Sequence, residues 1–126
     1  TPFDWRIGVL GRKPFFACMY LMSKNHWEVV KHESDGRHTE GESDTLDVAE
    51  TPAPVLRMAL KAADLIGDGL YGVDLKETAD GPVVIEVNDN PSLDAGVEDL
   101  VLGEELYRRV IGEFVQRLDR RRAGRP

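Results

Sequence analysis

The sequence has 126 residues, of which 41% are hydrophobic and 31% are charged, and its net charge is −7. This length suits one compact domain, and no apolar run approaches the roughly 20 residues that span a bilayer. The last ten residues hold five arginines and one aspartate, so this end carries +4 and the rest carries −11. So acidic a body argues against a nucleic-acid partner, and we expect no membrane partner either.

The N-terminus and the single cysteine favour a reducing cellular compartment for this protein. Residues 1–5 lack the basic and apolar regions of a signal peptide, and the missing initiator Met suggests an excerpt of a longer protein or a processed start. Cys18 alone forms no internal disulfide, which fits a reducing compartment, and its apolar neighbours favour a buried thiol. We therefore expect a cytoplasmic protein.

The first half of the chain is predicted to open with a hairpin. In residues 5–10, Trp5, Ile7 and Val9 alternate onto one face of a strand. A turn at 11–14 leads into the apolar run 15–22, predicted as a buried strand. The polar segment 31–47 is predicted as a loop, with short strands at 27–30 and 45–48 at its ends.

Two amphipathic helices are predicted in the second half. The first has Thr51 as N-cap and Pro52 at its first position, and it ends at Gly67. The second starts near residue 102 or 103, with acids in its first turn and arginines in its last. The apolar stripes that follow helical spacing are Val55, Leu56, Ala59, Leu60, Ala63 and Ile66 in the first, and Leu106, Val110, Ile111, Phe114 and Leu118 in the second.

Two more strands, 70–78 and 83–88, lie between these helices. The resulting order of elements predicts an α+β fold, an antiparallel β-sheet with helices packed on one face. Residues 1–118 are expected to form one domain, and residues 119–126 a basic tail without fixed structure.

The hairpin of these two strands carries the strongest chemical signal. A three-residue loop at 79–81 ending in Gly is a common connection, and centring it on Asp80 sets Asp74 directly opposite Glu86 and Leu75 opposite Ile85. Opposed like charges are destabilising, and a divalent cation would turn that repulsion into attraction.

Asp74, Glu86 and Asn88 are therefore candidate ligands for Mg²⁺ or Mn²⁺, shared with substrate phosphates. The alternative is a solvated sheet face on which Lys76 partly neutralises the acids. The predicted polar face holds Gly72, Asp74, Lys76, Val84, Glu86 and Asn88, and the apolar face, turned toward helices, holds Tyr71, Val73, Leu75, Val83, Ile85 and Val87.

Three motifs together resemble the metal-binding end of the ATP-grasp superfamily. They are GVDL at 72–75, VIEVN at 84–88 followed by NP at 90–91, and DWR at 4–6, which is similar to the Asp-x-Arg that opens the second half of that fold. The chain is most similar to the RimK-like and glutathione-synthetase-like branch of carboxylate–amine ligases, over nearly its full length.

The resemblance implies the C-terminal ATP-grasp subdomain, with ATP and Mg²⁺ (or Mn²⁺) as cofactors. Asp74, Glu86 and Asn88 would hold the metal ions, and Asn90 would belong to the nucleotide site. Arg6 would be catalytic, reaching the phosphates or an acyl phosphate, although an ordinary strand-face arginine is the alternative. ATP would phosphorylate a carboxylate, and an amine, in glutamate ligation for example, would displace the phosphate to form an amide or peptide bond.

Two departures from the family pattern bear on these expectations. The Arg-x-Asn element and basic stretch of ribosomal-protein-modifying members are replaced here by residues 23–32, where Asn25 and Lys31 could play analogous roles. The adenine-binding subdomain that precedes the Asp-x-Arg strand in the family is also missing. This chain alone is therefore expected to be inactive, and the surface left uncovered could support a homodimer.

Other polar signals are weaker. His26, His32 and His38 lack the close pair of ligands that zinc requires, and residues 88–99 depart from a calcium loop at Pro91 and Leu93. The acidic residues 94–99 could face a substrate amine or simply be solvated. The alternative functions are a non-catalytic α+β binding module, or degenerate relative, that uses the acidic loop 33–47, and, less favoured, a calcium-regulated module.

Overall fold

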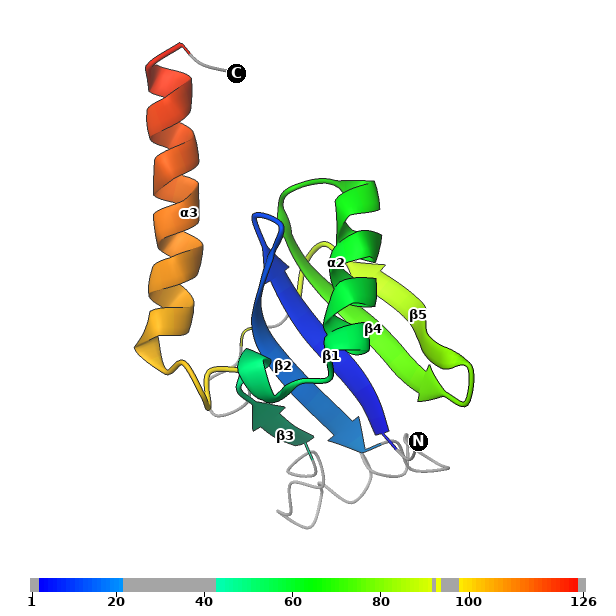
Figure 1. Cartoon of the computed structure of the whole chain (residues 1–126). Helices are drawn as coiled ribbons and strands as arrows, with labels where there is room; N and C mark the ends of the chain where they lie inside the picture. The colour runs from blue at the N-terminus through cyan, green and yellow to red at the C-terminus, as the bar shows by residue number, and fades with distance from the viewer. Residues whose placement is uncertain (1–2, 22–42, 92, 94–97, 125–126) are drawn as a thin grey trace, which may run out of the picture.

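The computed structural model describes residues 3–21, 43–91, 93 and 98–124, and it is built around one antiparallel sheet. The sheet has five strands in the order β3-β2-β1-β4-β5 (Figure 1). The strands are β1 (Phe3–Leu10), β2 (Lys13–Leu21), β3 (Ser43–Leu46), β4 (Leu70–Thr78) and β5 (Gly81–Asn88). The helices are the 3-10 turn η3 (Val48–Glu50), α2 (Ala53–Ile66) and α3 (Glu104–Arg122).

The predicted α+β fold with an antiparallel sheet is confirmed. The expected strand at 27–30, most of the loop at 31–47 and the candidate Lys31 lie outside the described residues. No helix in the described part of the chain is both long and apolar enough to cross a bilayer.

The β1–β2 hairpin turns on two residues rather than the four predicted. Gly11 and Arg12 both have positive φ, 55° and 70°, which is the pattern of the tight type I′ turn that suits the twist of paired strands. Lys13 and Pro14 already belong to β2. Together with a register shift between Gly8 and Val9, this turn pairs Arg6 with Cys18 and Ile7 with Ala17.

Helix α2 covers one face of the sheet (Figure 1). Val55, Ala59 and Ala63 pack against Ile7 and Val73, and all five side chains are buried. Alternation along β1 places Trp5 and Val9 in the same cluster, as predicted. Ile66 was expected in this stripe but is exposed, because it is the last residue of the helix, next to the terminating Gly67.

The start of α2 differs from the prediction. Pro52 occupies the N-cap position, without a side-chain cap, and Thr51 lies outside the helix. The Thr51 hydroxyl is buried and donates to the Asp47 carbonyl oxygen at 3.2 Å. Asp47 in turn caps η3 by accepting from the Ala49 amide at 2.9 Å, so the short strand predicted at 45–48 ends at Leu46 instead.

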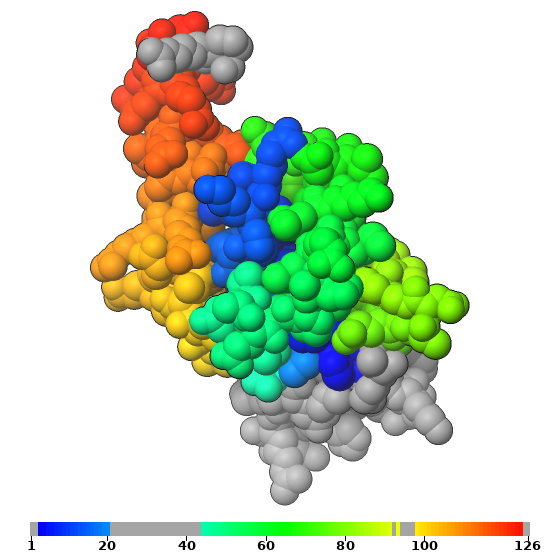
Figure 2. Space-filling view, viewed as in Figure 1, coloured from blue at the N-terminus to red at the C-terminus, as the bar shows by residue number. Residues whose placement is uncertain are grey.

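Helix α3 begins where predicted, but most of its apolar stripe is uncovered. Leu106 is fully buried with Leu10, Phe16 and Cys18, whose side chains alternate with those of the α2-covered face and so lie on the opposite face. Beyond this first turn, Ile111, Phe114 and Leu118 are exposed. The C-terminal turns of α3 project beyond the body of the molecule (Figure 2), and the face of α3 turned toward the β1–β2 hairpin carries Glu113 and Gln116 in place of that stripe.

Candidate metal and phosphate site

The face of the sheet opposite α2 brings three predicted site residues into one row. Arg6 of β1 pairs directly with Asp74 of β4, and Asp74 pairs directly with Glu86 of β5. Directly opposed residues have Cβ atoms about 4.5–5.5 Å apart. The row thus runs across three neighbouring strands, from the Arg6 cation through the Asp74 carboxylate to the Glu86 carboxylate.

The opposition of Asp74 and Glu86 is confirmed, but the hairpin reaches it by another route. The turn consists of Ala79 and Asp80 alone, so Thr78 pairs with Gly81 and Leu75 pairs with Val84, not Ile85. An irregularity between Leu75 and Asp74 then inserts one extra residue in β5. The shorter turn and the bulge shift the register in opposite directions, and their effects cancel at Asp74.

The bulge also changes which residues of β5 face the core. Val84 and Val87 both pack against the α2-side core. They are three positions apart in sequence, so a regular strand would place them on opposite faces. Val83 and Ile85 are exposed, Ile85 by 57%. The prediction that Val83 and Ile85 join the apolar face, with Val84 on the polar face, was therefore wrong.

Arg6 and Asp74 form a bidentate ion pair. Arg6 Nε donates to Asp74 Oδ1 at 2.8 Å, and Nη2 donates to Oδ2 at 3.1 Å. Their side chains are 27% and 20% exposed, so the pair is only partly screened by water. The hydrogen bonds from Arg6 to Asp74 raise the pKa of Arg6 above its usual value, against the opposing effect of burial.

Tyr20 and Glu98 complete the surroundings of Arg6. The Arg6 guanidinium lies over the Tyr20 ring, 5.1 Å from its centroid, and the Tyr20 hydroxyl donates to Glu98 Oε2 at 2.7 Å. Burial and then the bond to Glu98 raise the pKa of Tyr20 well above its usual range. Sequence reasoning missed Tyr20, whose signal was its alternation with Cys18 onto the face of Arg6, and considered Glu98 only as part of the acidic segment 94–99.

Asn88 and Asn90 lie at the end of β5. Asn88 pairs with Gly72, and its side-chain oxygen accepts a hydrogen bond from the Asn90 amide at 2.9 Å. An amide oxygen has two lone pairs, so this turn leaves one acceptor position for a ligand. Pro91 is buried, and a Cβ added to Gly72 would lie 2.9 Å from the Pro91 Cβ, so the close approach of this turn to β4 requires glycine.

The donor set fits a hard divalent cation that is shared with a ligand. Lys76 pairs with Asp4 at 3.1 Å, so the cation beside Asp74 is Arg6 rather than the Lys76 considered from sequence. In the described part of the chain, no three His, Cys, Asp or Glu side chains are placed to hold a metal together. Two carboxylates and an amide oxygen would leave the remaining positions to water and phosphate oxygens, as magnesium prefers.

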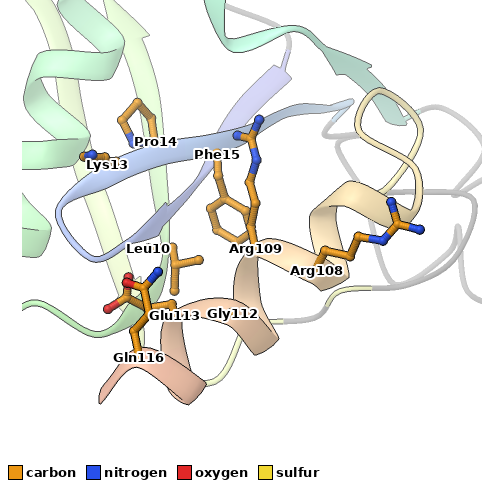
Figure 3. Close-up of a pocket in the computed structure, with 9 residues that line it drawn as sticks. All are labelled: Leu10, Lys13, Pro14, Phe15, Arg108, Arg109, Gly112, Glu113 and Gln116. Carbon is orange, nitrogen blue, oxygen red and sulfur yellow. The ribbon is translucent and has the colours of Figure 1, made fainter. Parts of the chain in front are cut away.

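A pocket lies elsewhere, between the β1–β2 hairpin and α3 (Figure 3). Its volume is about 460 Å³, and it is lined by side chains that include Phe15, Arg109 and Glu113. None of the predicted site residues lines it. Figure 3 shows Arg108 pointing away from the other labelled side chains, so the basic groups do not converge on one ligand.

The sequence matches known ligases over part of its length. The family model of the RimK-like ATP-grasp domain matches residues 37–106. A probable alpha-L-glutamate ligase of Thioalkalivibrio sulfidiphilus is 52% identical over 58 residues, 46% of this chain and 19% of the relative. One of Vibrio cholerae is 36% identical over 61 residues, 48% of this chain and again 19% of the relative. The match thus spans about a fifth of these relatives.

The fold is also that of solved ATP-grasp ligases. The ligase PsnB, complexed with a phosphomimetic variant of its minimal precursor, Mg and ADP, aligns with a TM-score of 0.56 at 19% identity, over 90% of this chain and 33% of its own. The D-alanine–D-alanine ligase of Bacillus anthracis complexed with ATP aligns with a TM-score of 0.61 at 12% identity, over 92% and 39%. At such identities these likenesses concern the fold alone, whereas the family model covers more than half of the sequence. The chain belongs to the RimK-like ATP-grasp domain family.

Proposed function

We propose that the complete protein is an ATP- and magnesium-dependent carboxylate–amine ligase that forms an amide or peptide bond through an acyl phosphate. The observation that supports this most is the row of Arg6, Asp74 and Glu86 on the open face of the sheet. The names of the relatives, probable alpha-L-glutamate ligases, favour glutamate as one substrate, with a small molecule or peptide as the other.

Asp74, Glu86 and Asn88 would hold the magnesium, which when bound would neutralise phosphate charge. Arg6 would bind the phosphates or the acyl phosphate, since its planar guanidinium matches phosphate oxygens with parallel hydrogen bonds. Asn90, whose amide orients Asn88, would lie at the nucleotide side. Lys31 stays a candidate nucleotide ligand outside the described residues.

The chemistry requires positioning and charge rather than classical acid–base groups. A substrate carboxylate oxygen attacks the terminal phosphorus of ATP, ADP leaves, and the amine then displaces phosphate from the acyl carbon. The role of this sheet face is to hold the phosphoryl group in place while charge moves between oxygens. Adenine binding and closure over the substrates would come from the N-terminal ATP-grasp subdomain of the complete protein.

The remaining expectations about the complete protein belong to the same proposal. Residues 1–118 belong to the C-terminal subdomain, and α3 continues through residues 119–122, so the prediction of a tail without fixed structure was wrong for these residues. The protein works in the cytoplasm, and the 126-residue chain without its partner subdomain does not catalyse ligation. A homodimer of the isolated chain is consistent with the exposed stripe of α3.

The test is ATP turnover by the complete protein carrying Asp74→Asn or Glu86→Gln. Each change removes one carboxylate charge, and we expect turnover to fall by at least about 100-fold. Asp80→Asn is the matched control, because Asp80 is exposed in the turn of the same hairpin, and it should leave turnover unchanged. Retained turnover in both site variants would refute the roles proposed for Asp74 and Glu86, and absence of turnover in the unmodified complete protein would favour the non-catalytic binding module.

A further inference from the structure

Arg6 has two different partners, one on each side. The guanidinium donates two hydrogen bonds to Asp74 of β4, while the Tyr20 ring of β2 lies under it. Resting on the proposed function, we propose that Tyr20 and Glu98 are positioning residues for Arg6. They hold the guanidinium at the site when Asp74 turns from Arg6 to the metal.

Charge repulsion explains why Arg6 needs a second contact to keep its guanidinium in place. A divalent cation bound by Asp74 would repel the neighbouring guanidinium and weaken its attraction to that carboxylate. An arginine side chain released from its ion pair regains much rotamer freedom. Arg6 could then bind a phosphate only after the cost of ordering it again, unless another contact keeps it in place.

The Tyr20 ring supplies such a contact. A guanidinium within about 6 Å of a ring centroid is attracted to the ring face, more strongly where water is partly excluded, and the observed distance is 5.1 Å. Cys18, the direct cross-strand neighbour of Arg6 on β2, carries no comparable group. Because burial raises the pKa of Cys18, its thiol stays neutral and does not compete for the guanidinium.

Glu98 fixes the ring and adds charge. It is only 2% exposed, and it accepts the Tyr20 hydroxyl at 2.7 Å, which sets the orientation of the ring. A buried carboxylate is costly unless it is hydrogen-bonded and compensated by a cation, and the Arg6 guanidinium lies over the ring of the tyrosine whose hydroxyl Glu98 accepts. Glu98 also links this contact to the segment that enters α3, far along the chain from β1.

Side-chain NMR of the 126-residue chain tests the proposal without any metal. Asp74→Ala removes both acceptor oxygens, so Arg6 then depends on its other contacts. We expect its Nε–H signal, assigned by its loss in Arg6→Lys, to remain protected from exchange with water. Adding Tyr20→Leu should accelerate that exchange about tenfold. Equal exchange rates with and without the ring would overturn the proposal.

Tyr107→Leu in the same background is the matched control. Tyr107 packs against the same apolar cluster as Tyr20, but its hydroxyl donates to Asp99 and to the Leu93 carbonyl. Its removal should leave Arg6 exchange unchanged, and acceleration equal to that of Tyr20→Leu would show a merely structural effect and overturn the proposal.

Milder variants keep the test informative if Tyr20→Leu does not fold. Tyr20→Phe keeps the ring and loses the bond to Glu98, and Glu98→Gln keeps an acceptor and loses the charge. Each should accelerate exchange about two- to threefold, and no acceleration in either would overturn the proposal. Separately, Mg²⁺ with ADP should shift the Arg6 signal of the unmodified chain. An absent shift would contradict the proposed metal site alone, because the exchange comparison contains no metal.

Discussion

The face of the sheet beneath α2 and the opposite face are built from alternate residues of the same strands. On the α2 side, Ile7, Val73 and Leu75 are completely buried. One residue away on the same strands, Arg6 and Asp74 form a partly exposed ion pair. Alternation along β1 and β4 thus places the apolar core and the charged row within one residue of each other.

The face beneath α2 contributes to the stability of the fold, whereas the opposite face carries the groups proposed for chemistry. The α2 side excludes water and supplies hydrophobic free energy, so it can be close-packed without polar groups. The opposite side keeps like charges opposed at Asp74 and Glu86, an arrangement that lowers stability unless a cation is near. We interpret the charged row as held rigid by the core behind it, which predicts that changes on the two faces have separable effects.

Leu75→Ala should produce the largest loss of stability. Leu75 is completely buried beneath α2, and truncating such a residue costs about 2–5 kcal/mol. Urea unfolding measures the change in free energy. Binding of Mn²⁺ by the molecules that remain folded should be unaffected, and a large loss of Mn²⁺ affinity would show that the two faces are coupled.

Gly8→Ala tests how tightly side chains pack next to the charged row, on the same face of the sheet. A Cβ on Gly8 would lie 2.1 Å from Cε2 of Phe16, so the ring must move. Overpacking of this kind costs about 1–3 kcal/mol, which thermal unfolding would detect. An unchanged midpoint would mean that the Phe16 ring is not fixed over β1.

Glu86→Gln should have the smallest effect on stability and the opposite sign. It removes the repulsion between Glu86 and Asp74 and should raise the free energy of unfolding by up to about 1 kcal/mol, measured in urea without divalent cations. The same change should weaken Mn²⁺ binding. A variant that is both less stable and unchanged in Mn²⁺ binding would make Glu86 a structural residue.

Local patterns predicted much of the fold and of the charged row. Period-two alternation predicted the buried face of β1, and helical spacing predicted α2 and the start of α3. Three motifs gave Arg6, Asp74 and Glu86, which the structure brings together. The opposition of the two carboxylates was predicted correctly for an incomplete reason, because neither the two-residue turn nor the bulge in β5 was recognised.

The errors arose where tertiary structure overrides local pattern. The two-residue turn shifts the register of residues 81–84 by one, so Val84 rather than Val83 lies on the face of the core. The α3 stripe follows helical spacing correctly, yet of its residues only Leu106 and, in part, Val110 pack against the core. The hydrogen bond between Tyr20 and Glu98 joins residues 78 positions apart in sequence, and no periodic pattern reports contacts of that range.

The most direct test of the account is a Mn²⁺ titration of the 126-residue chain, followed by paramagnetic broadening of its amide NMR signals. The account predicts selective broadening at Asp74 and at residues 86–88, reversed by excess Mg²⁺ and lost in Asp74→Asn. Ca²⁺ in place of Mg²⁺ separates a calcium-regulated module from a magnesium site. Broadening confined to the acidic segment 33–47, with the β4–β5 hairpin untouched, would contradict the metal site and leave the charged row as ordinary surface.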